Sequence, residues 1–281
     1  LRPFHLNQRR RPTLEKNSGS ETLFTPRKFC HCHITLEDPM CACISQFDLI
    51  AFDADDTLWN NEDLYTHAQD QLKSMLASFA PPDQTGSLLY DLESRNIPLY
   101  GYGIKGFTLS MIETAVQISN GVIPSTEILK IIQVAREMMT APVQMLPHAA
   151  DVIRQLSEHC PLMIITKGDI FDQERKIERS GLQSHFKHIE IVSQKTPESY
   201  AALLEHYQIA PCRFLMVGNT LRSDILPVVD IGGWGVYIPQ ANNWSHEHAS
   251  PTEKQKQSFV ELEHLGQLPL LLENWPDFTG G

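Results

Sequence analysis

Residues Phe47 to Trp59 read FDLIAFDADDTLW, an apolar run that ends in three carboxylates and a threonine. Such a run, bounded by polar residues, is typical of a strand buried on both faces of a sheet. The carboxylates of Asp53, Asp55 and Asp56 would leave this strand together at its carboxyl end, where open α/β sheets bind ligands. Like charges crowded in this way are costly unless a cation or catalysis requires them. We therefore expect the active site at this point of the chain.

The composition is that of an ordinary globular protein, with 281 residues of which 42% are hydrophobic and 20% charged. No apolar run approaches the roughly 18 residues of a membrane span, and the opening residues do not resemble a signal peptide. The formal net charge of −11 argues against nucleic acid as the main partner, because phosphate backbones attract basic surfaces. We expect a cytoplasmic protein that binds neither nucleic acid nor membrane, of an oligomeric state that the sequence leaves open.

Residues 1–46 differ from the rest of the chain. They carry seven Lys/Arg against four Asp/Glu, which leaves 16 basic and 30 acidic residues for the remainder. Four of the six cysteines lie here, in CHCH at 30–33 and CAC at 41–43. A zinc site is one alternative, but structural zinc sites usually separate their thiolates by two to four residues rather than one. We favour a disordered extension that takes no part in the fold.

The other two cysteines, Cys160 and Cys212, border predicted strands, and we expect both to be small core residues. A reducing, cytoplasmic setting fits this usage.

From Pro147 onward, predicted strands and helices alternate. The strands are expected at residues 161–166, 189–192, 214–217 and 236–238, and the helices at 149–156, 169–180 and 196–207. Thr196 and Pro197 form a good N-cap and first-turn pair for the last of these helices. Such alternation predicts βαβ units and therefore an α/β fold with a doubly wound parallel sheet.

Residues 63–142 show helical periodicity alone. Apolar residues recur at helical spacing over 64–79, 104–118 and 124–138, and we expect Pro81-Pro82-Asp83 to stop the first of these helices. The chain is thus predicted to have three parts. Residues 1–46 form an extension, residues 47–62 and 143–281 form an α/β core, and residues 63–142 form an all-helical insert.

Polar groups follow the next three strands as well. They are Thr166 and Lys167 after the second strand, Lys195 after the third, and Asn219 and Asp224 after the fourth. Because the carboxyl ends of parallel strands meet at one edge of a sheet, these groups should lie beside Asp53 and Asp55. The set suits phosphoryl transfer, since one carboxylate can attack phosphorus and a second can move protons. Mg²⁺ prefers such oxygen ligands, and a hydroxyl and a lysine can hold the transferring oxygens.

The chain resembles the haloacid dehalogenase superfamily of hydrolases, in its phosphatase form, over about residues 47–240. Four family motifs occur in order: Asp-x-Asp-x-Thr after a strand, a strand-terminal Thr, a Lys ahead of a helix, and Gly-Asp-x-x-x-x-Asp. They match Asp53, Asp55 and Thr57, then Thr166, then Lys195, and finally Gly218 and Asp224. In the fourth motif Asn219 occupies the position of the first acid.

The resemblance implies a role for each matching residue. Asp53 is implied as the nucleophile and Asp55 as the general acid/base, with Thr166 and Lys195 as further catalytic residues. Mg²⁺ would be bound by the Asp53 side chain, the Asp55 main-chain carbonyl, and Asn219 or Asp224. Residues 63–142 would be a cap domain that supplies substrate specificity. Thr166, Lys167 and Lys195 are the candidate substrate-binding residues.

One departure from the family pattern and one match to it bear on the chemistry. Asn219 removes one negative charge from the cation site, and because an amide oxygen still binds Mg²⁺, weaker metal binding is expected rather than loss of activity. Asp55 argues for phosphate esters, since the dehalogenase branch lacks an acid two residues after its nucleophile.

Several residues have two interpretations. Asp56 either offsets the charge lost at position 219 or caps the local turn, and Lys167 either contacts substrate or lies in solvent. Four residues could line the cap pocket, but we favour core or rim packing for them: Trp59, Tyr100, Tyr102 and Lys105. His246 and His248 have the spacing of a metal pair, but we favour a solvated loop.

The sequence thus predicts a Mg²⁺-dependent phosphatase that hydrolyses a small phosphorylated metabolite through an aspartyl-phosphate on Asp53. One alternative is a catalytically weak protein that binds a phosphorylated ligand, which Asn219 alone favours. The other is a phosphotransferase or mutase of the same superfamily. The sequence does not name the substrate.

Overall fold

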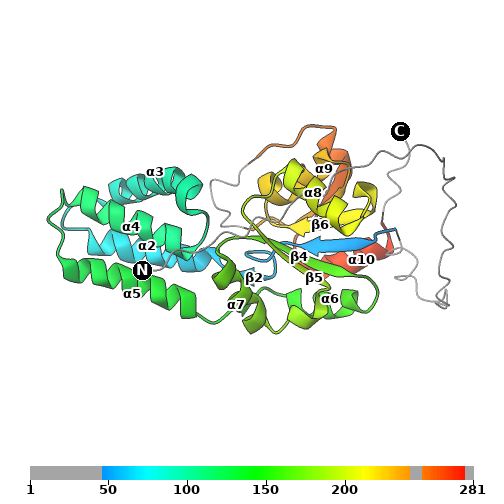
Figure 1. Cartoon of the computed structure of the whole chain (residues 1–281), viewed down its shortest axis with the longest axis horizontal. Helices are drawn as coiled ribbons and strands as arrows, with labels where there is room; N and C mark the ends of the chain where they lie inside the picture. The colour runs from blue at the N-terminus through cyan, green and yellow to red at the C-terminus, as the bar shows by residue number, and fades with distance from the viewer. Residues whose placement is uncertain (1–45, 241–248, 276–281) are drawn as a thin grey trace, which may run out of the picture. The chain divides into compact units, whose positions relative to one another are not determined.

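A six-stranded parallel sheet forms the centre of the computed structural model, which describes residues 46–240 and 249–275 (Figure 1). Its strand order is β5-β4-β1-β6-β7-β8. The strands are β1 Leu49–Phe52, β4 Leu162–Lys167, β5 His188–Val192, β6 Phe214–Gly218, β7 Trp234–Tyr237 and β8 Phe259–Glu261. Strands β4 and β5 lie on one side of β1, and strands β6, β7 and β8 lie on the other. The predicted doubly wound α/β fold is confirmed.

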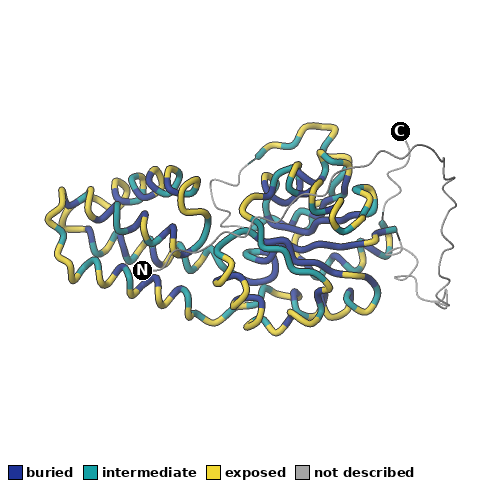
Figure 2. Tube along the Cα trace, in the orientation of Figure 1, coloured by how far each residue is buried: buried dark blue, intermediate teal, exposed yellow. Residues whose placement is uncertain are grey.

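The central strands are buried on both faces because side chains alternate along each strand. In β1, Ile50 and Phe52 belong to one apolar cluster, whereas Leu49 and Ala51 belong to another. All four are buried, and the central strands are dark blue in Figure 2. Helices α6 Ala149–Ser157, α7 Ile170–Ser180 and α10 Leu268–Glu273 contribute to the first cluster, and α8 Pro197–Tyr207 and α9 Leu226–Asp230 to the second.

Four helices lie between β2 Trp59–Asn60 and β3 Gln144–Met145, which pair antiparallel. The helices are α2 Glu62–Met75, α3 Pro82–Tyr100, α4 Ile104–Ile118 and α5 Ser125–Thr140. They share an apolar cluster of their own, to which each contributes a buried side chain: Leu72, Leu89, Met111 and Ile131 in turn. We call α2–α5 the helical insert; its action as a cap domain with the expected boundaries stays a prediction.

The prediction missed helix α3. Helix α2 ends before Pro81-Pro82-Asp83, as expected, but Pro82 is also the first residue of α3, a position where the missing N–H costs no helical hydrogen bond. Gly86 and Pro98 lie inside α3 and lower its intrinsic helical propensity, so packing against the other helices of the insert decides its conformation. Helix α2 also ends at Met75, before the expected residue 79.

Three short strands were missed as well. Strands β2 and β3 have two residues each and β8 has three, which is too short for an alternating pattern to be recognised. Strand β7 begins at Trp234 rather than at residue 236 and ends at Tyr237.

One of the two cysteine predictions was wrong. Cys160 is buried as expected, but Cys212 is exposed, because it lies in the 3₁₀ turn Pro211–Arg213 before β6 and outside the sheet. The Cys/His extension, His246 and His248 lie outside the described residues. Within residues 46–240 and 249–275, no helix combines the length and apolar character of a membrane span.

The last residue of β6, Gly218, has to be a glycine because the side chain of Asp224 packs closely against it. A Cβ added here would lie 2.5 Å from the side chain of Asp224, which follows in the π-helical turn Leu221–Ile225. The Asp224 carboxylate cannot move aside freely, because its Oδ2 accepts from the Thr220 amide at 3.0 Å and from the Thr220 hydroxyl at 2.8 Å. The missing side chain therefore allows Asp224 to fold back over the end of β6.

We expect Gly218→Ala to destabilise the protein by about 1–3 kcal/mol, because the new methyl group overpacks this turn. Gly86→Ala is the matched control: the nearest atom to its Cβ is Lys73 Cε at 3.5 Å, and alanine in a helix should stabilise by roughly 0.5–1 kcal/mol. Urea unfolding of both variants measures the difference. Equal stability of the two would contradict the close contact at Gly218.

Candidate active site

The carboxyl edge of the sheet brings together residues from four strand ends. Asp53 follows β1, Thr166 lies near the end of β4, Lys195 comes after β5, and Asn219 follows β6. The chain reverses its direction of strand addition at β1, and ligand sites of open α/β sheets form at such a switch point. A cavity opens over these ends, and Asp53, Thr166, Asn219 and Asp224 line it.

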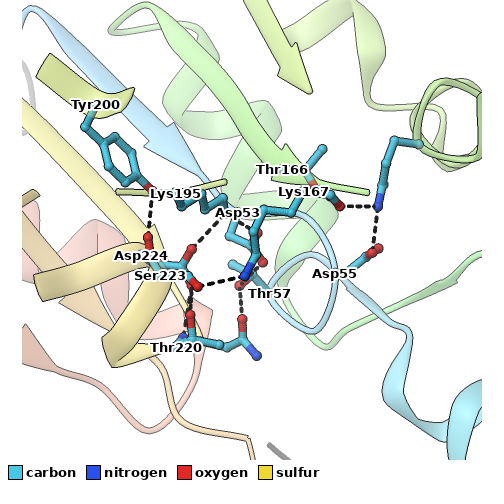
Figure 3. Close-up of polar contacts among 12 residues, drawn as sticks. Asp53, Asp55, Thr57, Thr166, Lys167, Lys195, Tyr200, Thr220, Ser223 and Asp224 are labelled. Atoms are coloured by element: carbon cyan, nitrogen blue, oxygen red, sulfur yellow. Dashed lines mark hydrogen bonds and ion pairs between the residues drawn. The ribbon is translucent and has the colours of Figure 1, made fainter. Parts of the chain in front are cut away.

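Lys195 joins two of the carboxylates that line the cavity, Asp53 and Asp224 (Figure 3). Its Nζ lies 2.5 Å from Asp53 Oδ1 and 2.7 Å from Asp224 Oδ1. The Lys195 and Asp224 side chains are each 1% exposed and that of Asp53 is 10% exposed. A buried charge is tolerated only when it is paired in this way, so each of these three residues requires the others.

The electrostatics follow from this burial. Desolvation raises the pKa of Asp53 above its ordinary value, opposed by the ammonium of Lys195 and supported by the charge of Asp224. Burial alone would lower the pKa of Lys195, but Asp224 and Asp53 raise it above its usual range. Lys195 therefore stays positive and can attract an anionic group to Asp53.

Oxygen atoms that suit a hard cation gather on the other side of Asp53. The Thr57 hydroxyl lies 3.1 Å from Asp53 Oδ2 and 3.2 Å from Asn219 Oδ1, so these two oxygens face the same point. The described residues contain no group of three or more His, Cys, Asp or Glu placed to hold a metal ion. An amide and a main-chain carbonyl can supply the remaining ligands, and an all-oxygen set of this kind fits Mg²⁺.

Asp55 has a different environment from Asp53. Figure 3 shows its side chain apart from the Asp53, Lys195 and Asp224 group. Its carboxylate accepts hydrogen bonds from Trp59 Nε1 at 2.7 Å and from Gln173 Nε2 at 2.8 Å, and it pairs with Lys176 Nζ at 2.7 Å. Sequence reasoning missed Gln173 and Lys176, and no signal marked them, because they lie within helix α7 and outside every motif.

Asp56 accepts hydrogen bonds at the start of helix α2, whereas the sequence suggested that it caps the local turn or offsets the charge lost at position 219. Its Oδ1 accepts from the amides of Asn61 and Glu62 at the start of α2, at 2.8 and 3.0 Å. Its backbone has φ 61°, a left-handed conformation that aspartate adopts more readily than most residues. Burial raises the pKa of Asp56 to about 6, against the effect of these two hydrogen bonds.

Lys167 borders the cavity and is half-buried. Its Nζ donates to Ser223 Oγ at 2.7 Å and lies 4.6 Å from the centre of the Tyr102 ring. Tyr102 lines the cavity too, against the favoured expectation of core or rim packing.

The remaining pocket candidates do not line this cavity. Trp59 is a core residue at 1% exposure, and Tyr100 is exposed. Lys105 instead forms an ion pair with Asp169 at 2.9 Å.

The helical insert supplies polar cavity residues that no motif marked. They include Glu62, Tyr65, Gln69, Glu93 and Asn96. Burial raises the pKa of Glu62 to about 8, reinforced by Asp56 and Glu93, and burial raises that of Glu93 to about 7. Neither carboxylate forms an ion pair in the described part of the chain, which accounts for these shifts.

Comparison with known proteins identifies the family. The haloacid dehalogenase-like hydrolase family model matches residues 47–232. The chain therefore belongs to the haloacid dehalogenase-like hydrolases, as its motifs predicted. No curated protein matches the chain.

Solved structures agree with this assignment. A haloacid dehalogenase-like family hydrolase from Xanthomonas campestris is 36% identical, with a TM-score of 0.72, and the match covers 82% of this chain and 91% of that one. The putative HAD-hydrolase YfnB from Bacillus subtilis, bound to magnesium, is 18% identical with a TM-score of 0.59 and coverages of 80% and 98%. A 2-haloacid dehalogenase from Pseudomonas syringae pv. tomato is 21% identical, with a TM-score of 0.54 and coverages of 82% and 100%. The last two show the fold alone.

The raised pKa of Glu62 predicts how stability changes with pH. Between the ordinary value of 4.5 and the folded value of about 8, the folded protein retains a proton that the unfolded chain has lost. Stability contributed by this group therefore falls as pH rises through that window. We expect Glu62→Gln to stabilise the protein at pH 8 by on the order of 1 kcal/mol and to change little at pH 5.

Thermal unfolding at the two pH values measures this effect. Glu137→Gln, at an exposed position of α5, is the control and should show no such pH-dependent gain. A Glu62→Gln variant whose stability relative to wild type is the same at both pH values would contradict the burial of this carboxyl group.

Proposed function

We propose that this hydrolase is a Mg²⁺-dependent phosphatase for small phosphate monoesters, with Asp53 as nucleophile and Asp55 as general acid/base. The observation that carries the proposal is the buried contact between Asp53 and Lys195, with a second carboxylate two residues along the chain. Lys195 would hold the phosphoryl oxygens against Asp53, and the Thr166 hydroxyl and Lys167 ammonium would bind the same group from β4. Mg²⁺ held by Asp53, the Asp55 carbonyl and Asn219 or Asp224 would supply positive charge beside those oxygens.

The reaction has two steps. An oxygen of Asp53 attacks phosphorus and forms an aspartyl-phosphate, while the bond from phosphorus to the ester oxygen breaks and that oxygen takes the proton of Asp55. A water oxygen then attacks phosphorus and gives a proton to Asp55. The bond from phosphorus to Asp53 breaks, which releases phosphate and restores both carboxyl groups to their starting states.

Asp55 separates this proposal from haloacid dehalogenation. Displacement of a halide needs no proton, because halide is a stable leaving group, whereas an alkoxide leaving group needs an acid. A carboxyl group placed two residues after the nucleophile and reaching the cavity would assist departure of the alkoxide, a step that dehalogenation does not contain.

Asn219 favours a second candidate function, a catalytically weak protein that binds a phosphorylated ligand. The amide leaves the cation site with less negative charge than a carboxylate would, so the ion is held more weakly. Phosphate release with and without EDTA separates the two. Release that EDTA abolishes supports the phosphatase, and binding of phosphate without any release supports the alternative.

We expect Asp53→Asn to lower phosphate release from p-nitrophenyl phosphate by roughly 10³-fold or more, because the nucleophilic oxygen is lost. The fold should persist, since Lys195 keeps its 2.7 Å pair with Asp224. Asp48→Asn, before β1 in an exposed pair with Arg213, is the matched control and should retain activity. Undiminished turnover by Asp53→Asn would refute the assigned nucleophile.

Asn219→Asp should lower the Mg²⁺ concentration that gives half-maximal activity, because a carboxylate attracts the ion more strongly than an amide. Titration of phosphate release with MgCl₂ measures the change. Asn120→Asp makes the same substitution on an exposed turn of the helical insert and should leave the titration unchanged. An identical titration for Asn219→Asp and wild type would place Asn219 away from the ion.

A further inference from the structure

The Asp55 carboxylate has no acceptor position left for substrate. Its Oδ1 accepts from Trp59 Nε1 at 2.7 Å and from Lys176 Nζ at 2.8 Å. Its Oδ2 accepts from Gln173 Nε2 at 2.8 Å and from the same Lys176 ammonium at 2.7 Å. An ionised carboxylate has about four acceptor positions. To give a proton to a leaving oxygen, Asp55 must therefore leave at least one of these donors.

Two of the donors are held in place. Trp59 is fully buried and lies in β2, where it pairs with Met145 of β3. The second hydrogen of Gln173 Nε2 goes to the main-chain oxygen of Lys167 at 2.9 Å, and because that oxygen only accepts, it decides the orientation of the amide.

In this orientation, one atom of the Gln173 amide is in an unfavourable environment. Its Oε1 is buried and has no hydrogen-bond partner. An unsatisfied buried acceptor is unfavourable, which indicates that the donor to Asp55 is the reason for a glutamine here rather than the stability of the core.

Lys176 is the donor that has other acceptors within reach. Its Nζ also lies 3.2 Å from Asn61 Oδ1 and 3.7 Å from Asp172 Oδ2. Asp172 precedes Lys176 by one helical turn on α7, so both side chains lie on the same helix face. The Lys176 residue is only 8% exposed, and a buried ammonium needs a carboxylate partner at every stage of a reaction.

We propose that Lys176 is a positioning residue for Asp55, and that it moves to Asp172 each time Asp55 turns toward the leaving oxygen with a proton. When the Asp55 carboxyl group turns away, the Lys176 ammonium loses its two contacts with it, and Asp172 is the carboxylate one helical turn away that can balance the charge. When Asp55 turns back, Lys176 returns to it, and Gln173 and Trp59 restore the plane of the carboxyl group. This inference rests on the proposed phosphatase function and names residues that act through Asp55.

Two substrates of similar size test the inference. Phenyl phosphate has a poor leaving group that needs a proton, whereas p-nitrophenyl phosphate has a good one that does not. A residue that acts through Asp55 affects kcat/KM for phenyl phosphate selectively, because this constant reports the step in which the leaving group departs. A merely structural residue affects both substrates alike.

We expect Lys176→Met and Asp172→Asn to lower kcat/KM for phenyl phosphate by about tenfold or more beyond any loss with p-nitrophenyl phosphate. Arg175→Met, at an exposed position of the same helix, is the control and should leave the ratio of the two constants unchanged. In an Asp55→Asn background, neither substitution should alter that ratio further. Circular dichroism shows whether each variant folds. If Lys176→Met does not fold, Asp172→Asn still provides the test, because it only replaces one carboxylate oxygen by an amide nitrogen.

Equal losses with both substrates, or a further change of the ratio in the Asp55→Asn background, would overturn a role through Asp55. A selective effect of Lys176→Met without one of Asp172→Asn would overturn the movement to Asp172. These outcomes all require active wild-type protein. If wild type with Mg²⁺ released phosphate from neither ester, the phosphatase proposal itself would fail.

Discussion

The buried pairing of Lys195 with Asp53 and Asp224 is the constraint on which the site depends. An ammonium that is 1% exposed needs carboxylates within contact distance, and here they come from the ends of two different strands. Asp224 reaches Lys195 only because its turn folds back over Gly218, where a side chain would collide with it. The parallel sheet supplies the remaining condition, because its neighbouring strand ends all lie at one edge. The fold therefore brings these three charged groups together, and their pairing in turn makes it possible to bury them.

The turn after β1 gives two nearby carboxylates different surroundings. Residues two apart on a strand would point the same way, but the chain leaves the strand at Ala54, whose carbonyl accepts from the Leu58 amide at 2.8 Å. Asp53 remains over the sheet beside Lys195, whereas Asp55 turns toward helix α7 and meets Lys176. A nucleophile has to stay ionised and close to phosphorus, whereas an acid/base has to move a proton. Different neighbours allow these two proposed roles within three residues of chain.

Much of the core was predictable from sequence because its signals are local. The buried strand β1, the alternation of helix and strand and the polar groups at the strand ends can each be recognised within a few residues, and the family assignment followed from their order. Helix α3 was missed because Pro82 and Gly86 resemble breaks in a helix, although a proline in the first turn is harmless. Strands β2, β3 and β8 were missed because two or three residues carry no period. The assigned roles of the site residues stay predictions.

The sequence by itself determined which chemical groups stand at the ends of the strands, since each motif is continuous along the chain and strand direction decides where it emerges. Only the tertiary structure decided how those groups are paired. Asp55 and Lys176 are 121 positions apart, and Asp53 and Lys195 are 142 apart, so no local pattern relates them. Contacts at hydrogen-bond distance arise only when the sheet and helix α7 have packed. For the same reason, the three acids of residues 53–56 look equivalent in the sequence, whereas in the fold one pairs with Lys195, one with Lys176 and one caps a helix.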